Sequence, residues 1–363
     1  MKHKLLLLTF LLPLLLTAQS VFKIQSGVII KTTGGAIITL QDINLDNDGT
    51  INQLPGNGSF KFTGTQSNII SGLSSPLFDI LEIAKTGAAK VSLQRAINIG
   101  STLKFTSGLL DLNNNNIILS STGLINGETE TSRLTGTNGG YIQITSSLNA
   151  PSSSNPGNLG AVITSTQNLG STIIKRGHVS QTDVATPNFS INRYYDITPA
   201  TNTNLNATLR INYFDAELNG KTEANLSLWK STDNTNWTYT GFSNRSSVTN
   251  FAEANAIASF SRFTLSDKFA TGIFDLPSGR NSLQVWPNPY VESVTIGIQS
   301  TRATKANLQV YDMLGKLLFV QPLNVIQGAN KFSVKLSSFA KGLYQFKIIG
   351  SEGSVAVVPV VKQ

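Results

Sequence analysis

From residue 19 onward, the chain alternates short apolar runs with turns rich in Gly, Asn and Ser, and it shows almost no helical periodicity. In the segment 59–63, Phe60 and Phe62 alternate with polar neighbours, the pattern of a strand with one buried face. Segments of the same kind predict further strands at 78–83, 90–93, 96–99, 102–105, 108–112 and 116–119. The pattern predicts an all-β protein.

The spacing of these strands favours a repetitive fold for residues 19–150. Short strands separated by glycine turns are typical of the coils of a right-handed parallel β-solenoid. The run Asn113–Asn116 suits a stacked turn, because Asn tolerates positive φ and can bond to the neighbouring backbone. The repeat is imperfect in length, so an antiparallel β-sandwich stays open as the alternative.

The composition changes at residues 149–158, which are rich in Pro, Ser and Asn and have the composition of a linker or long loop. Longer apolar segments follow. They predict an antiparallel β-sandwich-like domain over 151–276, with strands at 161–164, 171–175, 188–197, 206–214, 226–230, 237–239 and 260–265.

Residues 283–363 have the clearest strand alternation in the chain. Val294, Ile296 and Ile298 point to one face, while the residues between them point to the other. The segment 312–316 is predicted to be a hairpin turn, with Gly315 able to take positive φ. Several short antiparallel strands at this spacing predict a small immunoglobulin-like β-sandwich.

Three motifs in this last segment occur in order: residues 285–289 (Val-Trp-Pro-Asn-Pro), residues 308–316 ending in Gly-Lys, and residues 340–348 containing Gly-Leu-Tyr. A basic residue, Lys362, lies next to the end. Together they resemble the type A C-terminal sorting domain of the type IX secretion system of Bacteroidetes. An ordinary immunoglobulin-like module is the alternative. The positions that match the family motif are Pro287, Asn288, Pro289, Gly315, Lys316, Gly342 and Tyr344.

The resemblance implies that residues 277–363 are a linker followed by a sorting domain. It implies export through the periplasm, recognition by the type IX secretion translocon and its sortase machinery, and release from the cell or attachment to the outer-membrane cell surface. In the family, the sorting domain is commonly cleaved and the passenger is joined to surface lipopolysaccharide.

The N-terminus has the pattern of a secretory signal peptide over residues 1–18. Lys2, His3 and Lys4 precede the apolar run 5–16, and small residues precede a cleavage site expected between Ala18 and Gln19. The run is shorter than the roughly 20 residues that a membrane-spanning helix needs.

The formal charge of the whole chain is +8, which suggests an anionic partner. The charge of each segment, counted separately, removes most of that suggestion. Residues 1–18 carry +2, and residues 283–363, with eight basic and three acidic side chains, carry +5. Residues 19–282 are left with +1, and no basic cluster interleaved with aromatics occurs there. No nucleic-acid partner is therefore expected.

The chain contains no cysteine, which excludes disulfides and thiolate chemistry.

The segment 44–49 resembles the opening of a calcium loop, with Asp46 and Asp48 as candidate Ca²⁺ ligands. It departs from the full pattern, since Asn44 stands at the first ligand position and Pro55 stands where a bidentate Glu is needed. A polar turn is the favoured interpretation, and no other cofactor is expected.

No constellation of catalytic residues stands out. His178 is the only histidine after the predicted leader, and the favoured role for it is a structural hydrogen bond. The carboxylate pairs 215/217 and 79/82 are weak candidates for glycoside hydrolysis, and Lys61, Arg95 and Lys104 are undistinguished as lyase bases. The aromatic residues Trp229, Trp237, Tyr239 and Phe242 are predicted to form the core and rim of the second domain rather than a sugar platform.

The sequence therefore predicts an exported protein with a non-enzymatic passenger that serves adhesion, glycan contact or envelope structure. The alternative is a carbohydrate-active enzyme, a polysaccharide lyase or hydrolase, on a β-solenoid. Two carboxylates about 5 to 9 Å apart in a groove would favour hydrolysis.

Overall fold

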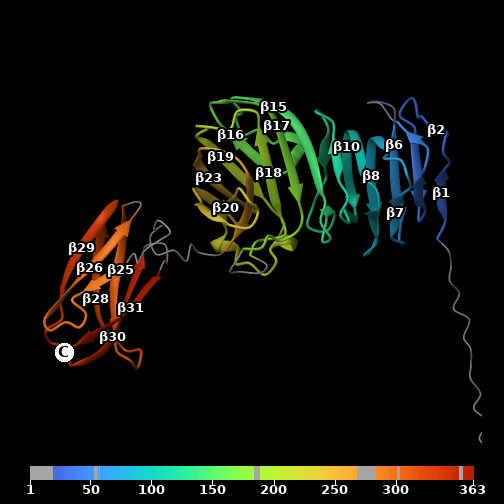
Figure 1. Cartoon of the computed structure of the whole chain (residues 1–363). Helices are drawn as coiled ribbons and strands as arrows, with labels where there is room; N and C mark the ends of the chain where they lie inside the picture. The colour runs from blue at the N-terminus through green and yellow to red at the C-terminus, as the bar shows by residue number, and fades with distance from the viewer. Residues whose placement is uncertain are drawn as a thin grey trace, which may run out of the picture. The chain divides into compact units, whose positions relative to one another are not determined.

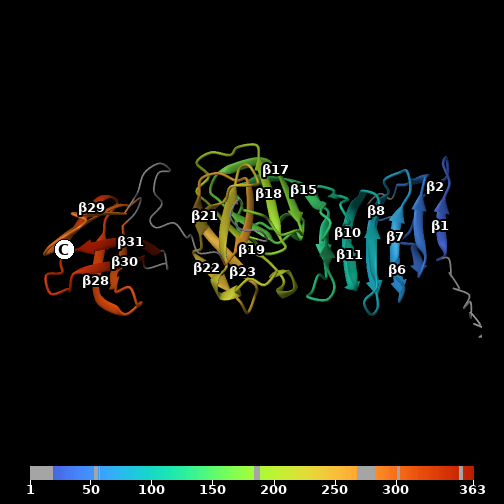
Figure 2. The ribbon, with the colours of Figure 1, turned by 60° about the horizontal axis from the view of Figure 1, so that its bottom comes forward.

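The computed structural model describes residues 19–52, 56, 58–183, 189–267, 283–300, 303–350 and 355–363. The chain divides between Ser266 and Asp267 into two compact units (Figures 1 and 2). It is nearly all β, with 56% of its residues in strands. The predicted signal peptide lies outside the described residues.

The first unit begins with a β-solenoid of about 5 turns. One wall is a six-stranded sheet of β1 (Val21–Ile24), β4 (Asn44–Asn47), β7 (Asn68–Ser71), β9 (Lys90–Leu93), β11 (Leu109–Asp111) and β14 (Leu134–Thr135). The other wall contains β3 (Ile37–Gln41), β6 (Ser59–Gly64), β8 (Leu77–Lys85), β10 (Ile97–Ser107), β12 (Ile117–Leu119) and β15 (Tyr141–Asn149). Two short pieces, β2 (Ile29–Ile30) and β5 (Thr50–Ile51), pair with each other, and β13 (Leu124–Asn126) pairs with β10. Neighbours within both walls run parallel, which confirms the solenoid and excludes the antiparallel alternative for this region.

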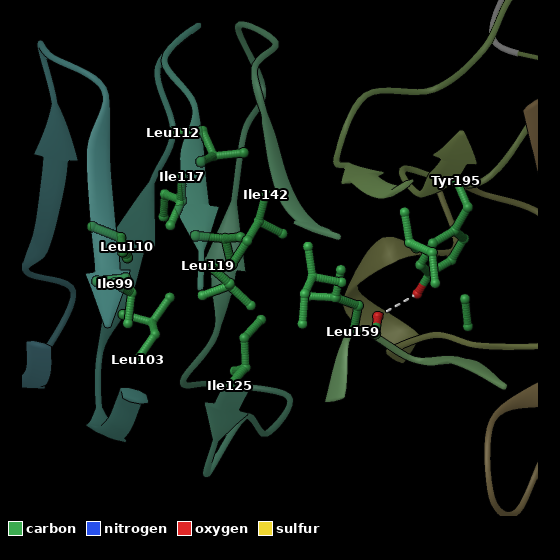
Figure 3. Packing of buried hydrophobic residues seen from close by; sticks show 14 of the residues in the cluster. Ile99, Leu103, Leu110, Leu112, Ile117, Leu119, Ile125, Ile142, Leu159 and Tyr195 are labelled. Atoms are coloured by element: carbon green, nitrogen blue, oxygen red, sulfur yellow. Dashed lines mark hydrogen bonds between the residues drawn. The ribbon is translucent and has the colours of Figure 1, made fainter. Parts of the chain in front are cut away.

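Register explains how the solenoid builds its core. Phe60 is aligned with Ile38 on one side and with Leu81 on the other, and Phe62 is aligned with Leu40 and Ile83. Because successive coils place apolar residues at equivalent positions, their side chains stack inward in continuous rows. Figure 3 shows the later part of this stack, from Leu103 and Leu110 through Ile142 to Leu159.

The sheet changes character at β15. This strand is parallel to β12 on one side and antiparallel to β17 (Asn168–Gly177) on the other. The same sheet then continues through β18 (Tyr194–Pro199), β24 (Arg262–Ser266), β20 (Ser227–Ser231) and β21 (Thr238–Gly241). The solenoid and the central antiparallel region therefore share a sheet and one hydrophobic cluster that extends from Ile24 to Leu265.

A four-stranded antiparallel sheet completes the first unit. It consists of β16 (Ala161–Thr164), β19 (Ala207–Asn212), β23 (Phe251–Ile257) and β22 (Asn244–Ser246). Three short 3₁₀ helices, η1 (Pro156–Asn158), η2 (Asp215–Glu217) and η3 (Glu223–Asn225), lie in the connections. The predicted boundary at residue 150 falls just after β15, and the division into domains there remains a prediction.

Most of the predicted strands are confirmed. The predicted strand 188–197 is confirmed only from Tyr194 onward, where β18 begins. The segments 96–99 and 102–105 are parts of one strand, β10, which an irregularity between Ile99 and Thr102 interrupts. The strands β22 and β23 were not predicted, because their sequences contain short or polar side chains at most positions.

The second unit is a β-sandwich of two antiparallel sheets. One consists of β25 (Leu283–Trp286), β26 (Ser293–Ser300) and β29 (Gly328–Lys335). The other consists of β28 (Leu317–Val325), β27 (Thr304–Tyr311), β30 (Gly342–Gly350) and β31 (Val355–Lys362). Val294, Ile296 and Ile298 are buried in a separate hydrophobic cluster, which confirms the predicted alternation.

Candidate functional sites in the two units

The Pro-Asn-Pro segment of the second unit is tied to the last strand, β31. The Asn288 Nδ2 donates to the Pro359 carbonyl over 3.1 Å, and the Asn288 Oδ1 accepts from the Val361 N–H over 2.9 Å. The Tyr290 N–H continues the contact by donating to the Val361 carbonyl. Pro287 and Pro289 are exposed on either side of Asn288. This segment therefore joins the beginning of the sandwich to its end.

Lys362, on β31, contacts the same region from the interior of the sandwich. Its side chain is buried, and the ammonium donates to the carbonyls of Leu336 and Ser337 over 2.9 and 2.8 Å. The Nζ also lies 5.5 Å from the centre of the Tyr290 ring, within cation–π range. Burial raises the pKa of the Tyr290 hydroxyl to about 12, with a smaller contribution from Tyr344. The basic residue near the end of the sequence is thus part of the packing of the sandwich.

The other motif positions lie at turns and strand ends. The Asp312 Oδ1 accepts from the Leu314 and Lys316 N–H groups, both over 2.9 Å, and Gly315 takes a φ of +81°. That conformation suits glycine and confirms the predicted hairpin turn. Gly315, Lys316 and Gly342 are exposed, whereas Tyr344 is buried and donates its hydroxyl to the Ala340 carbonyl over 2.6 Å.

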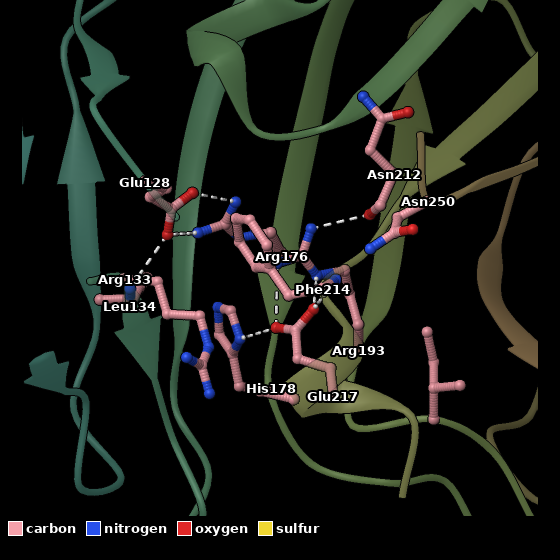
Figure 4. Close-up of polar contacts among 12 residues, drawn as sticks. Glu128, Arg133, Leu134, Arg176, His178, Arg193, Asn212, Phe214, Glu217 and Asn250 are labelled. Atoms are coloured by element: carbon pink, nitrogen blue, oxygen red, sulfur yellow. Dashed lines mark hydrogen bonds and ion pairs between the residues drawn. The ribbon is translucent and has the colours of Figure 1, made fainter. Parts of the chain in front are cut away.

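The first unit holds a buried charge cluster of Glu128, Arg176, His178, Arg193 and Glu217 (Figure 4). Arg176 on β17 donates to both carboxylate oxygens of Glu128, over 2.9 and 2.7 Å. The Arg193 Nη2 donates to Glu217 Oε1 over 2.9 Å, and the His178 Nδ1 lies 3.0 Å from the same oxygen. Because Glu128 follows the solenoid strand β13, the cluster fastens the last coils to the antiparallel region.

Electrostatics fixes the protonation states in the charge cluster. Burial lowers the pKa of His178 to about 4, even though Glu217 favours the protonated form. Burial alone would raise the pKa of Glu217, but the charge of Arg193 and the bond with His178 outweigh it and hold the pKa at about 2. At neutral pH the cluster therefore contains a neutral imidazole and two carboxylates that each face a guanidinium. The predicted structural role of His178 agrees with this geometry.

The sequence contained a sign of this cluster. Arg176 is 1% exposed and His178 is 5% exposed. Both are an even number of positions from the buried Ile174, so in a strand they point to the same, inward face. Polar residues at inward positions of a strand indicate a buried network, because a buried charge needs a partner. The partners Glu128 and Glu217 could not be predicted from sequence, since they come from distant loops.

The carboxylate pair 215/217 does not converge. Side chains two positions apart share a face in a strand, whereas these residues form the 3₁₀ helix η2. Asp215 is exposed and accepts from the Asn250 amide over 2.7 Å, while Glu217 is buried in the charge cluster. The two carboxylates have different environments and cannot act together on one bond in this conformation.

The pair 79/82 on β8 is also divided between two environments. Glu82 is 8% exposed and lies between Lys61 and Lys104, at 3.1 and 3.4 Å. Register places these three residues side by side on β6, β8 and β10, so they form a cross-strand charge ladder. Asp79 is buried and accepts from the Ser101 hydroxyl. Both lyase-base candidates, Lys61 and Lys104, are engaged by Glu82.

The candidate calcium ligands lie together, but they are engaged by a lysine. Asp46 and Asp48 each have a carboxylate oxygen 2.6 Å from the Lys23 ammonium, and the Asp48 Oδ1 also accepts from the Leu73 N–H. Among the residues that the structure describes, no group of three or more His, Cys, Asp or Glu side chains is arranged to hold a metal ion. A calcium site at Asp46 and Asp48 stays a prediction, and the position between the two carboxylates is that of the ammonium.

The aromatic residues pack as predicted. Trp229 is buried and contacts Phe189 and Tyr239 edge to face, with ring centres 5.1 and 5.2 Å apart. Trp237 lies at the rim and donates its indole N–H to the Thr182 carbonyl.

Gln19, at the predicted cleavage site, donates its amide to the Ser67 carbonyl over 2.7 Å. In the described part of the chain, no helix is long and apolar enough to cross a membrane.

The two units define a class of protein, a β-solenoid with an antiparallel extension followed by a separate small β-sandwich. Residues 284–362 match the family model described as a secretion system C-terminal sorting domain. The match shows a type IX secretion sorting domain over these residues. No curated protein matches the chain. The sorting domain implies interaction with the type IX secretion machinery, export, and a secreted or cell-surface location.

Proposed function

We propose that residues 19–266 form a non-enzymatic passenger that makes contacts at the cell surface, either with glycans or with other components of the envelope. The sorting domain supplies the route, and the solenoid supplies the contact surface. After transfer through the outer membrane, the sortase machinery removes the sorting domain and joins the passenger to surface lipopolysaccharide. A leader over residues 1–18, cleaved before Gln19, takes the chain into the periplasm.

The observation that carries this proposal is the outer face of the solenoid. In the six-stranded wall, register aligns Ser92 with Asp111 and Asp111 with Thr135 along the solenoid axis. The other wall carries the charge ladder of Lys61, Glu82 and Lys104. Parallel strands repeat about every 4.8 Å, so these polar groups form evenly spaced rows. Asp111 and Glu82 are buried within these rows, and the more exposed hydroxyl and ammonium groups beside them suit a repetitive polar polymer such as a glycan.

The state of the carboxylates also supports a contact role. The four carboxylates singled out by sequence are engaged in the buried charge cluster, the charge ladder, or hydrogen bonds with Ser101 and Asn250. Glycoside hydrolysis needs one carboxyl group that donates a proton and a second that attacks or activates water. An ion-paired Glu82 and a Glu217 with a pKa of about 2 are poorly suited to donate a proton.

The test is a binding screen combined with an activity screen on residues 19–363. We expect retention on a glycan array or on isolated envelope polysaccharide, without release of reducing ends. The variant Ser71→Glu/Ser92→Glu adds two charges to the six-stranded wall and should weaken retention. The control variant Ser152→Glu/Thr201→Glu adds the same charge at exposed positions between strands and should bind normally. Turnover of a polysaccharide would refute the non-enzymatic proposal, and equal binding by both variants would refute the role of this wall.

A further inference from the structure

Lys85 is a fully buried lysine whose ammonium lies inside the solenoid at the end of β8. Its side chain is 0% exposed. The Nζ lies 2.7 Å from Asn68 Oδ1, 3.1 Å from Asp42 Oδ1 and 2.5 Å from the Thr63 carbonyl. Asn68, the first residue of β7, is itself 1% exposed, and its Nδ2 has no hydrogen-bond partner. The cluster thus brings a buried amine and a buried carboxamide together with a carboxylate whose side chain is 30% exposed.

The separation between the amine and the carboxamide carbon is close to that of reacting atoms. With a C=O bond of about 1.23 Å and an angle of at least 90° at Oδ1, the Nζ lies between about 3.0 and 3.9 Å from Asn68 Cγ. Reacting atoms held about 3–3.5 Å apart gain a large rate advantage over the same groups free in solution. The reaction needs a base for the ammonium proton, and Asp42 is in contact with that ammonium.

We propose that Lys85 and Asn68 join in an intramolecular isopeptide bond, with Asp42 as the proton carrier. Asp42 takes a proton from the Lys85 ammonium, and the neutral amine attacks Asn68 Cγ. As the C–N bond to Nδ2 breaks, Asp42 returns its proton and the attacking nitrogen gives up a second one, so that Nδ2 departs as an ammonium ion. The sum of the steps is an ammonium and a carboxamide that give a secondary amide and one ammonium ion, so atoms and charge balance without an oxidant or a cofactor.

The position of the bond explains what it does for the solenoid. Asn68 begins a strand of the six-stranded wall, Lys85 ends a strand of the opposite wall, and Asp42 belongs to the preceding coil. The bond would link the two walls covalently within one coil. A cysteine-free protein that works outside the cell has no disulfides to restrict its unfolded chain, and this cross-link would serve that purpose.

Peptide mapping of the purified full-length protein tests the proposal. Trypsin cleaves after unmodified lysine, so an unlinked chain releases residues 62–85 and 86–90 as separate peptides. The isopeptide bond blocks cleavage at Lys85, and we expect a single peptide of residues 62–90 that is lighter by one ammonia molecule. This local readout separates the bond from cyclisation of an N-terminal Gln19, which also releases ammonia. Recovery of peptide 62–85 at its unmodified mass after prolonged incubation of the folded protein would overturn the proposal and leave Lys85 as a neutralised buried cation.

Variants assign the roles. Lys85→Arg keeps the charge but removes the nucleophile, so the linked peptide should disappear. Lys90→Arg alters the next lysine in the sequence, which is half-buried and paired with Asp111, and should leave the linkage in place. Asp42→Asn removes the proton carrier and should lower the linked fraction at least tenfold after equal incubation. Full linkage in Asp42→Asn would overturn the role of Asp42. None of these outcomes depends on whether the passenger binds glycans.

Discussion

Replacement of Glu217 by Gln should be among the most destabilising single changes of charge in the passenger. Glu217 accepts hydrogen bonds from Arg193 and from the Phe214 N–H, and His178 Nδ1 contacts the same carboxylate. The amide keeps the shape of the side chain but removes its charge. The guanidinium of Arg193, 2% exposed, would then remain buried without its counter-ion.

The size of the effect follows from the pKa. Holding Glu217 at about 2 rather than 4.5 corresponds to about 3 kcal/mol of stability at neutral pH, at 1.36 kcal/mol per pKa unit. Breaking a buried ion pair by removal of one partner costs about 3–5 kcal/mol in general. Both routes give about 3–5 kcal/mol, a large part of the roughly 5–15 kcal/mol that stabilises a typical domain.

Equilibrium unfolding in urea, followed through the fluorescence of Trp229 and Trp237, measures this loss. Glu253→Gln is the matched control, because Glu253 pairs with Arg210 at the surface, where the side chains are 19% and 36% exposed. An exposed pair contributes about 0–1 kcal/mol. If Glu217→Gln lost no more stability than Glu253→Gln, the buried pair of Glu217 and Arg193 could not supply the stabilisation that we assign to it.

Three further predictions concern pH, the sandwich and export. Because burial lowers the pKa of His178 from 6.5 to about 4, the unfolded chain binds a proton in this range that the folded chain does not, so the free energy of unfolding should fall by about 3 kcal/mol as the pH drops from 7 to 4. Urea titrations of His178→Asn should show a shallower pH dependence; an unchanged slope between pH 7 and 5 would contradict the assignment. Asn288→Ala removes two hydrogen bonds to β31 and should lower the stability of the sandwich by about 1–3 kcal/mol, measured by thermal unfolding of residues 267–363 against Asn324→Ala as an exposed control. Deletion of residues 283–363 should strand the passenger in the periplasm, and its detection at the surface by protease shaving would count against the sorting function.

Local patterns in the sequence predicted the strands well, because the alternation of apolar and polar residues that marks a half-buried strand is visible within a few positions. The alternation at Phe60 and Phe62 predicts a strand whichever neighbour it pairs with. What the pattern left open was the partner. Parallel stacking depends on contacts between residues some twenty positions apart, such as Phe60 with Leu81, and the uneven length of the coils obscured that spacing.

The candidate sites show the same limit. The resemblance of residues 283–363 identified the sorting domain, because its motifs are local and ordered. The charge cluster, in contrast, joins Glu128 to Arg176 across 48 positions, and the isopeptide candidates lie on separate walls. The weak candidate pair 215/217 does not converge, because a short 3₁₀ helix turns one carboxylate inward and the other outward.

The two ends of the solenoid indicate why the antiparallel region and the charge cluster belong to the same unit. A parallel stack ends in unpaired strand edges, which can pair with other chains unless they are covered. At the C-terminal end, β17 pairs with β15 and continues the sheet into antiparallel strands, so the last coil has no free edge in that wall. A cap of this kind protects only while it stays attached, and the ion pair between Glu128 and Arg176 joins the last coils to the capping strand directly. At the N-terminal end, β1 and β3 are the edge strands among the residues that the structure describes, and Val21 and Ile37 are more than half exposed. Association of the passenger, where it occurs, should therefore begin at the N-terminal coil, and weakening the charge cluster should add a second site at the other end.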